Sequence, residues 1–151
     1  MKKYIIIICI ILFIGIIFLF SSLKGEVSDR QSIGLLENTV GKVASIIDKD
    51  ITEEEKHELY LKLNYPLRKL AHILEFFILS LLVCLFLHKL NIGMLKVIVF
   101  TFIICFIFAC GDEIHQLFVI DRHGSFFDVF VDSIGIVIML LIYYFKERGK
   151  V

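Results

Sequence analysis

Four long apolar runs, separated by polar segments, decide what this chain of 151 residues can fold into. Each run holds 17 to 20 residues, which reach roughly 25–30 Å as a helix, about the thickness of a bilayer's hydrocarbon core. Charged residues gather at the ends of the runs and in one long insert, a distribution typical of membrane proteins. We therefore predict an all-α fold, a single integral membrane bundle of four transmembrane helices at about 4–20, 67–88, 92–111 and 125–145.

The first run raises the question of a cleaved signal peptide, because two lysines, Lys2 and Lys3, precede it. The apolar stretch is longer than in most signal peptides, and the SSLKG that follows it offers no clean small-x-small cleavage site. We expect this segment to remain in the protein as a transmembrane helix.

Lysine and arginine residues near the ends of the runs predict the orientation of the chain, because cytoplasmic loops carry an excess of them. Three segments would be cytoplasmic by this rule, and their basic residues are Lys2, Lys3, Lys89, Lys96, Lys146, Arg148 and Lys150. The opposite side would hold the insert at 21–65, with six bases and nine acids, and the Asp112–Ser125 loop. We expect both termini in the cytoplasm and an extracytoplasmic insert.

The insert at 21–65 contains two helical patterns. Apolar residues recur at helical spacing over 33–47, and Thr52 with Glu55 forms the sequence of a capping box that would start a second helix. Pro66 would then occupy the first turn of the second transmembrane helix. The insert is interpreted as a lid, which either only covers the outer mouth of the bundle or gates access from the outer leaflet. The sequence does not separate these two.

Three of the apolar helices carry one polar stripe each. At about 100° per residue, residues three, four or seven positions apart share a helix face. The stripes are Arg68, His72 and Glu75 on the second helix, Asp112, Glu113 and Gln116 at the end of the third, and Ser125, Asp128, Asp132 and Gly135 on the fourth. Lys69 falls outside the first stripe and is interpreted as an anchor at the membrane interface.

The stripes lie in the outer half of the membrane. Glu75 is nine residues past Pro66, and Asp132 is seven past Ser125, which places both roughly 10–13 Å below the outer interface. The inner halves of the same helices contain no acidic or basic residue. A transporter or proton channel needs polar groups along the whole crossing, so the pattern favours a pocket that opens on one side only.

The carboxyl groups of Glu75, Asp128 and Asp132 need partners, because an ionised acid at a helix centre costs about 2.5–3.5 kcal/mol. Arg68 and Arg122 are the available cations, which leaves an excess of negative charge. Either some carboxyl groups are protonated or a cation binds.

A metal site is an alternative for part of this set, although a purely hydrogen-bonded cluster is favoured over it. Its oxygen-rich ligands would suit a divalent cation such as Mg²⁺ or Mn²⁺. The ligands would be His72, Glu113, Asp128 and Asp132. No dedicated ligand spacing supports the site, so no cofactor is assigned.

Other kinds of site have no signature in the sequence. It contains no GxSxG serine motif, no phosphate-binding glycine loop and no basic patch. With a formal net charge of zero, nothing indicates a nucleic-acid partner. Ser125 is interpreted as the N-cap of the fourth helix rather than as a nucleophile.

The polar residues together carry a resemblance to a known family. RKLAHILEF from Arg68, DEIHQ from Asp112, RHGSFFD from Arg122 and DSIG from Asp132 resemble the VanZ family, as does FSS at 20–22. That family is named for a membrane protein associated with resistance to the glycopeptide teicoplanin. The chain departs from the pattern at Leu23, where members often carry Gln, and at Ile120–Asp121, where a Pro-Gly pair is frequent.

The resemblance implies a role in the bacterial cell envelope and does not imply a reaction. Its core set here is Arg68, Lys69, His72, Glu75, Asp112, Glu113, Gln116, Arg122, Asp128, Asp132 and Gly135. We take His72, Glu75, Asp112, Glu113, Asp128 and Asp132 as candidate catalytic residues, Arg68, Gln116 and Arg122 as candidate ligand-binding residues, and Lys69, Ser125 and Gly135 as structural.

Three hypotheses follow. In the first, an outward-facing pocket in the cytoplasmic membrane binds, and in one version modifies, a lipid-linked or phosphate-bearing headgroup substrate. In the second, a non-enzymatic membrane protein alters the access of an antibiotic to the cell surface. In the third, the polar cluster is purely structural. Membrane lipids are the expected partners, and the sequence does not indicate an oligomeric state.

Overall fold

The computed structural model describes residues 2–23, 30, 32–38, 52–120, 122 and 124–149. Four long helices make up most of this part of the chain, and its regular structure is entirely helical. They are α1 (Lys2–Ser21), α3 (Glu53–His88), α4 (Met94–Gln116) and α5 (Phe126–Arg148). All four are long and apolar enough to cross a membrane. The predicted all-α bundle of four membrane-spanning helices is confirmed.

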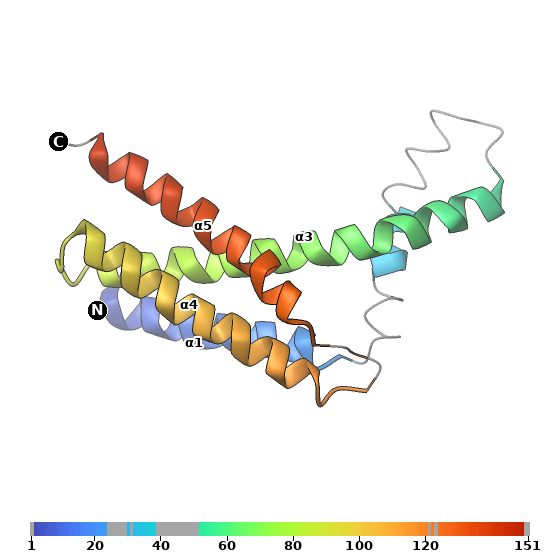
Figure 1. Cartoon of the computed structure of the whole chain (residues 1–151), viewed down its shortest axis with the longest axis horizontal. Helices are drawn as coiled ribbons and strands as arrows, with labels where there is room; N and C mark the ends of the chain where they lie inside the picture. Colours follow the sequence, from blue (N-terminus) through green and yellow to red (C-terminus); the bar gives the residue numbers. More distant parts are fainter. Residues whose placement is uncertain are drawn as a thin grey trace.

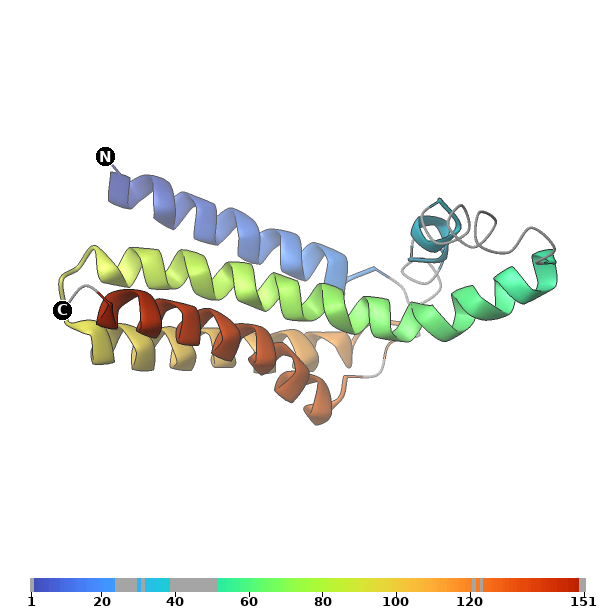
Figure 2. The same ribbon diagram turned by 90° about the horizontal axis from the view of Figure 1, so that it is seen from above.

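The helices lie side by side along most of their length (Figure 1). Both chain termini and the turn between α3 and α4 lie at one end of the bundle, which we call the terminal end. The end of α1, the end of α4 and the start of α5 lie at the opposite end, called the insert end. The first part of α3 extends beyond the bundle at the insert end (Figure 2).

A narrow apolar core holds the bundle together. Its fully buried side chains include Phe76 and Leu79 of α3, Cys105 of α4 and Ile136 of α5. Large apolar side chains also cover the outer surface, and most of their area is exposed. An apolar exterior is unfavourable in water but matches the acyl chains of a bilayer, so the helices can be apolar on all sides.

Helix α3 is longer than the sequence predicts. Thr52 caps it as expected, since its Oγ1 accepts from the N–H of Glu55 at 3.2 Å and Glu55 Oε2 accepts from the Thr52 N–H at 2.8 Å. The expectation of a separate helix that ends before Pro66 is wrong, because α3 is continuous for 36 residues and Pro66 lies inside it. Proline removes one N–H donor, and the helix bends in this stretch instead of ending (Figure 2).

Helix α4 also continues past its predicted end. We expected a loop from Asp112, but α4 runs to Gln116 and carries two acids into the bundle. Asp112 is fully buried and Glu113 is 6% exposed. The helix continues because side chains at its end bond to one another and to the start of α5, as described below.

Part of the insert is described, and residues 32–38 are helical. Leu36 is buried and Ile33 is half-buried, which agrees with the start of the amphipathic pattern. The remainder of that pattern, over 40–47, lies outside the described residues. Ser32 and Leu35 line a cavity at the insert end, so this segment lies over that end of the bundle.

Candidate functional site

The polar side chains of three helices gather at the insert end. Four of them are buried although they are acidic or amide side chains: Asp112, Glu113, Gln116 and Asp132. Burying such groups costs free energy unless they are paired or hydrogen-bonded. We call the following set the insert-end cluster: Arg68, Lys69, His72, Glu75, Asp112, Glu113, Gln116, Arg122, Asp128 and Asp132.

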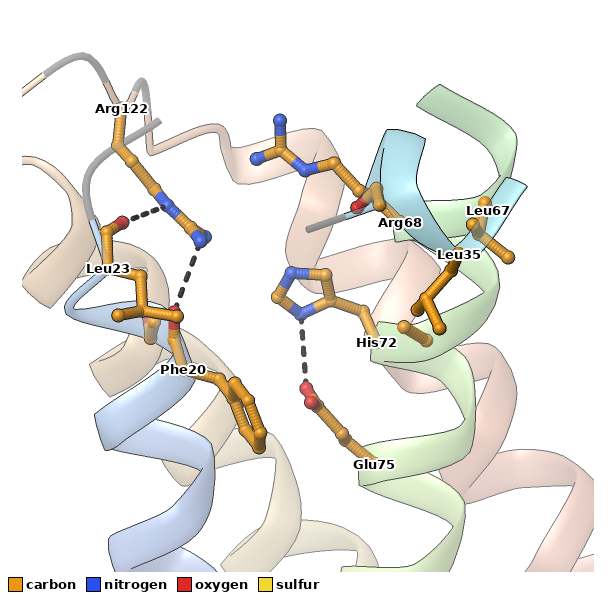
Figure 3. A pocket seen from close by; sticks show the side chains of 11 residues that line it. Phe20, Leu23, Leu35, Leu67, Arg68, His72, Glu75 and Arg122 are labelled. Carbon is orange, nitrogen blue, oxygen red and sulfur yellow. Dashed lines mark hydrogen bonds and ion pairs between the residues drawn. The ribbon is translucent and has the colours of Figure 1, made fainter. Parts of the chain in front are cut away.

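The stripe on α3 lines a cavity next to the end of α1. The cavity has a volume of about 290 Å³, and Arg68, His72 and Glu75 all line it. Figure 3 shows these three side chains on one face of α3, opposite Phe20 and Arg122. The prediction that the stripe forms one face is confirmed. The other lining residues are Ser21, Leu23, Ser32, Leu35, Leu67 and Ala71.

His72 lies between two carboxyl groups. Its Nδ1 is 3.7 Å from Oε2 of Glu75 on the same helix and 3.6 Å from Oδ1 of Asp132 on α5. Both distances are slightly longer than a hydrogen bond. In Figure 3 the other ring nitrogen, Nε2, points away from Glu75 toward the space near Arg68. An imidazole with one nitrogen facing carboxyl groups presents its other nitrogen to a ligand.

Gly135 allows α5 to approach α3 closely beside this histidine. A Cβ at Gly135 would overlap the carbonyl oxygen of Ile73 and lie 2.9 Å from the backbone nitrogen of Phe77. Only glycine fits such a contact between two helix backbones. Asp132 lies one turn before Gly135 on α5, so the close approach also sets its distance from His72. The structural role predicted for Gly135 agrees with this geometry.

Two buried carboxyl groups have oxygens without a hydrogen-bond partner among the described residues. These atoms are Oδ1 and Oδ2 of Asp132, a residue that is 1% exposed, and Oδ1 of Asp112. A buried polar atom without a partner lowers stability, and a functional role is one reason for retaining it. Their position beside His72 makes the insert-end cluster the strongest candidate site in the described part of the chain.

Lys69 pairs with Asp128 across two helices. Its Nζ lies 2.5 Å from Oδ2 of Asp128, and both side chains are 19% exposed. The interpretation of Lys69 as an anchor at the membrane interface did not include this partner, and the pair agrees with the structural role expected for Lys69. The sequence contained one signal for this pair, because Asp128 in an apolar run needs a cation and Lys69 lies at a similar depth on α3.

The end of α4 is held by side-chain hydrogen bonds. Gln116 Nε2 donates to Oδ2 of Asp112 at 2.8 Å and, at a longer 3.5 Å, to Oε1 of Glu113. Glu113 Oε2 accepts from the backbone N–H of Ser125 at 2.8 Å. Ser125 in turn caps α5, since its Oγ accepts from the N–H of Phe127 at 3.2 Å, which confirms its predicted role. These contacts join α4 to the start of α5.

Arg122 forms hydrogen bonds to the end of α1. Its Nε donates to the carbonyl oxygen of Leu23 at 3.1 Å, and one terminal nitrogen donates to that of Phe20 at 3.1 Å (Figure 3). The other terminal nitrogen lies 3.4 Å from Oε1 of Gln116. Much of the guanidinium therefore bonds to the protein itself. Since the contact at Leu23 uses a backbone carbonyl, the departure from the family pattern at this position leaves it intact.

Two further contacts at this end were not predicted from the sequence. His115 Nε2 lies 2.9 Å from the hydroxyl of Ser22, which joins α4 to the end of α1. A Cβ at Gly124 would overlap the carbonyl oxygen of Glu113, so the chain before α5 packs tightly on α4. The FSS motif at 20–22 contained a signal for the first contact, because a serine hydroxyl at a helix end seeks a polar partner.

A second cavity lies beside the first and has a volume of about 240 Å³. Its lining is more polar than that of the first cavity, and it includes the Lys69–Asp128 pair and Gln116. Arg68, His72 and Arg122 line both cavities. These three side chains therefore lie where the two cavities adjoin.

The geometry does not favour the metal alternative. Among the described residues, no three His, Cys, Asp or Glu side chains come together in a way that could hold a metal ion. Asp128 pairs with Lys69, and Glu113 accepts from Ser125, so two of the four candidate ligands have other partners.

Comparison with known proteins identifies the family of the chain. The family model described as VanZ/LLP1 matches residues 5–147, which is nearly the whole chain. No curated protein and no solved structure matches the chain. Four membrane-spanning helices and this match lead to one conclusion: the chain is a membrane protein of the VanZ/LLP1 family.

Proposed function

We propose that this protein acts in the bacterial cell envelope and that its insert-end cavity binds an anionic headgroup of a membrane lipid or of a lipid-linked molecule. One observation carries the proposal: Arg68, His72 and Glu75 line a cavity of about 290 Å³ whose other lining side chains are mostly apolar. A guanidinium group matches the oxygens of a phosphate, and its attraction for an anion is stronger in a weakly hydrated cavity than in water.

The apolar part of the lining supports a lipid rather than a free anion. Phe20 and Leu35 line the cavity and are 49% and 63% exposed, so this wall continues onto the outer surface. A hydrocarbon chain could leave the cavity along these side chains and remain in the bilayer. The cavity thus offers a charged contact and an apolar exit, the two parts that an anionic amphiphile needs.

The proposed orientation places this cavity on the extracytoplasmic side. Basic residues of the described chain that lie at or near the terminal end are Lys3, Lys89, Lys96, Lys146 and Arg148. By the positive-inside rule this end faces the cytoplasm in a bacterial cytoplasmic membrane. The insert end then faces the outer leaflet, where cell-envelope lipids and glycopeptide antibiotics meet.

A second candidate function is acid–base chemistry on the bound headgroup. The position of His72 between Glu75 and Asp132 favours it, since catalytic hydrogen bonds are often long before a ligand binds. Glu75→Gln separates binding from catalysis, because an amide cannot exchange a proton as a carboxyl group does. This variant should retain ligand and lose turnover if the second candidate is right.

The functional test is teicoplanin susceptibility of a sensitive bacterial host that expresses wild type, Arg68→Gln or Glu75→Gln. The matched control is Lys62→Gln, an exposed position on the same helix. Membrane abundance is measured for every variant. We expect wild type and Lys62→Gln to protect the host and Arg68→Gln to lose protection at normal abundance.

Two results would contradict parts of the proposal. Full protection by Arg68→Gln would exclude the cavity as the site of action. Absence of protection by wild type would overturn the antibiotic role and leave lipid binding to be tested directly.

A further inference from the structure

The two cavities at the insert end differ in the chemistry of their walls. Away from the shared residues, five of the eight residues that line the first cavity are apolar: Phe20, Leu23, Leu35, Leu67 and Ala71. The other three are Ser21, Ser32 and Glu75. The second is lined by Tyr65, Lys69, Gln116 and Asp128. One cavity therefore suits a hydrocarbon chain, and the other suits a group that both donates and accepts hydrogen bonds.

The boundary between the cavities is cationic. Arg68, His72 and Arg122 line both cavities, and Figure 3 shows Arg68 and His72 on α3 opposite Arg122. A phosphate at this position would lie between two guanidinium charges, and the planar donors of Arg68 match its oxygens. Arg122 contributes mainly its charge, because its nitrogens also bond to Leu23, Phe20 and Gln116. His72 Nε2 points toward the same space, while its Nδ1 faces Glu75 and Asp132.

The sizes of the two cavities suit a drug-sized ligand only when the cavities are taken together. Pockets for drug-sized ligands measure roughly 300–1,000 Å³. The two cavities here are about 290 Å³ and about 240 Å³, so each holds only part of such a molecule. Because they adjoin at three shared residues, one ligand can extend across both.

We infer that the ligand is an amphiphile with a phosphodiester at the Arg68–His72–Arg122 boundary, a hydrocarbon chain in the first cavity and a small hydroxylated headgroup in the second. This inference rests on the proposed function, because it presupposes that the insert-end cavity binds an anionic headgroup. It adds the order of the three parts and the nature of the headgroup. Asp128 and Gln116 accept from headgroup hydroxyls, and Lys69 donates to them.

The experiment uses the full chain purified in detergent and four soluble probes. They are dihexanoylphosphatidylglycerol, dihexanoylphosphatidylcholine, hexyl phosphate and glycerol 3-phosphate. Affinities are measured by titration calorimetry, with detergent alone as the blank for each probe. Dihexanoylphosphatidylglycerol should bind at least about tenfold more tightly than hexyl phosphate, glycerol 3-phosphate or the phosphatidylcholine, because it alone occupies both cavities with matching groups.

Two variants separate the cavities. Ala71→Phe fills the first cavity. It should weaken the binding of hexyl phosphate and of dihexanoylphosphatidylglycerol about tenfold, while the affinity for glycerol 3-phosphate stays the same. Its control is Leu74→Phe, which adds the same side chain at a position on α3 that is 51% exposed and lines neither cavity. The double variant Lys69→Gln/Asp128→Asn should abolish the preference for phosphatidylglycerol over phosphatidylcholine. Tyr65→Leu changes the same cavity without touching the ion pair and should reduce that preference.

The outcomes distinguish this inference from the function on which it rests. If the phosphate probes bind but Ala71→Phe weakens glycerol 3-phosphate as much as hexyl phosphate, the assignment of the two cavities is overturned. It is also overturned if phosphatidylglycerol binds no more tightly than phosphatidylcholine. If none of the phosphate probes binds to wild type, headgroup binding itself fails.

Discussion

The Nζ of Lys69 on α3 lies 2.5 Å from Oδ2 of Asp128 on α5, and each side chain is 19% exposed. The pair joins α3, which carries His72, to α5, which carries Asp132. Interhelical polar contacts in membranes average under about 1 kcal/mol, whereas breaking a buried ion pair by removing one partner costs about 3–5 kcal/mol. The free-energy cost of breaking a partly buried pair lies between these two values.

The first prediction concerns this ion pair. Lys69→Met and Asp128→Leu should each lower the free energy of unfolding by about 2 kcal/mol, because each leaves one charge without its partner. The double variant should lose less than the sum of the two, since it leaves no unpaired charge. Unfolding in detergent by a mild denaturant measures all four proteins. Strict additivity of the two losses would show that the pair does not couple α3 to α5.

The second prediction concerns Asp132. Its carboxyl oxygens have no hydrogen-bond partner among the described residues although the residue is 1% exposed. Replacing it by Asn keeps the shape and leaves no ionisable group at this buried position, so Asp132→Asn should not lower the melting temperature. The same variant should lose ligand binding or antibiotic protection, as expected where function is maintained at a cost in stability. A melting temperature lowered by several degrees would instead favour a structural role.

The third prediction compares two helical glycines. Gly135→Ala brings a Cβ against the backbone of Ile73 and should destabilise the bundle by about 1–3 kcal/mol, or roughly 2–12 °C in melting temperature if α3 and α5 must separate. Gly111 lies in α4, and a Cβ added there would meet nothing within 4 Å, so Gly111→Ala should be neutral or stabilising. Equal effects of the two substitutions would argue against the close approach of α5 to α3.

The fourth prediction concerns the hydrogen bonds by which Arg122 holds the end of α1. Its guanidinium donates to the carbonyl oxygens of Phe20 and Leu23, which hold the end of α1. Arg122→Lys keeps the charge but cannot make both bonds in the same geometry, so the protein should lose about 1–2 kcal/mol of stability. Arg148→Gln, at an exposed position of α5, serves as the control. An unchanged melting temperature in Arg122→Lys would show that these bonds contribute little.

Much of the fold could be predicted because it depends on local patterns. Runs of apolar residues as long as a bilayer is thick predict spanning helices, and the four helices are present. The caps at Thr52 and Ser125 follow from hydroxyl side chains at the right spacing before a helical run. The stripe of Arg68, His72 and Glu75 follows from helical periodicity, and the three side chains line one cavity.

The features that were missed depend on contacts between segments distant in the sequence. Pro66 signals a helix start, yet α3 continues through it, because a long helix can lose one hydrogen bond and bend. Asp112 and Glu113 look like loop residues, yet they are helical, and Gln116 and Ser125 each donate a hydrogen bond to one of their carboxyl groups. Lys69 looks like an interface anchor until α5 brings Asp128 beside it.

The central claim, that the insert-end cavity binds a phosphate-bearing amphiphile, is tested most directly by the binding of dihexanoylphosphatidylglycerol to purified wild type, Arg68→Gln and Lys62→Gln. We predict that wild type and Lys62→Gln bind the probe equally and that folded Arg68→Gln binds it at least about tenfold more weakly. Equal binding by all three proteins would contradict the account, because the probe would then not depend on the arginine that lines both cavities.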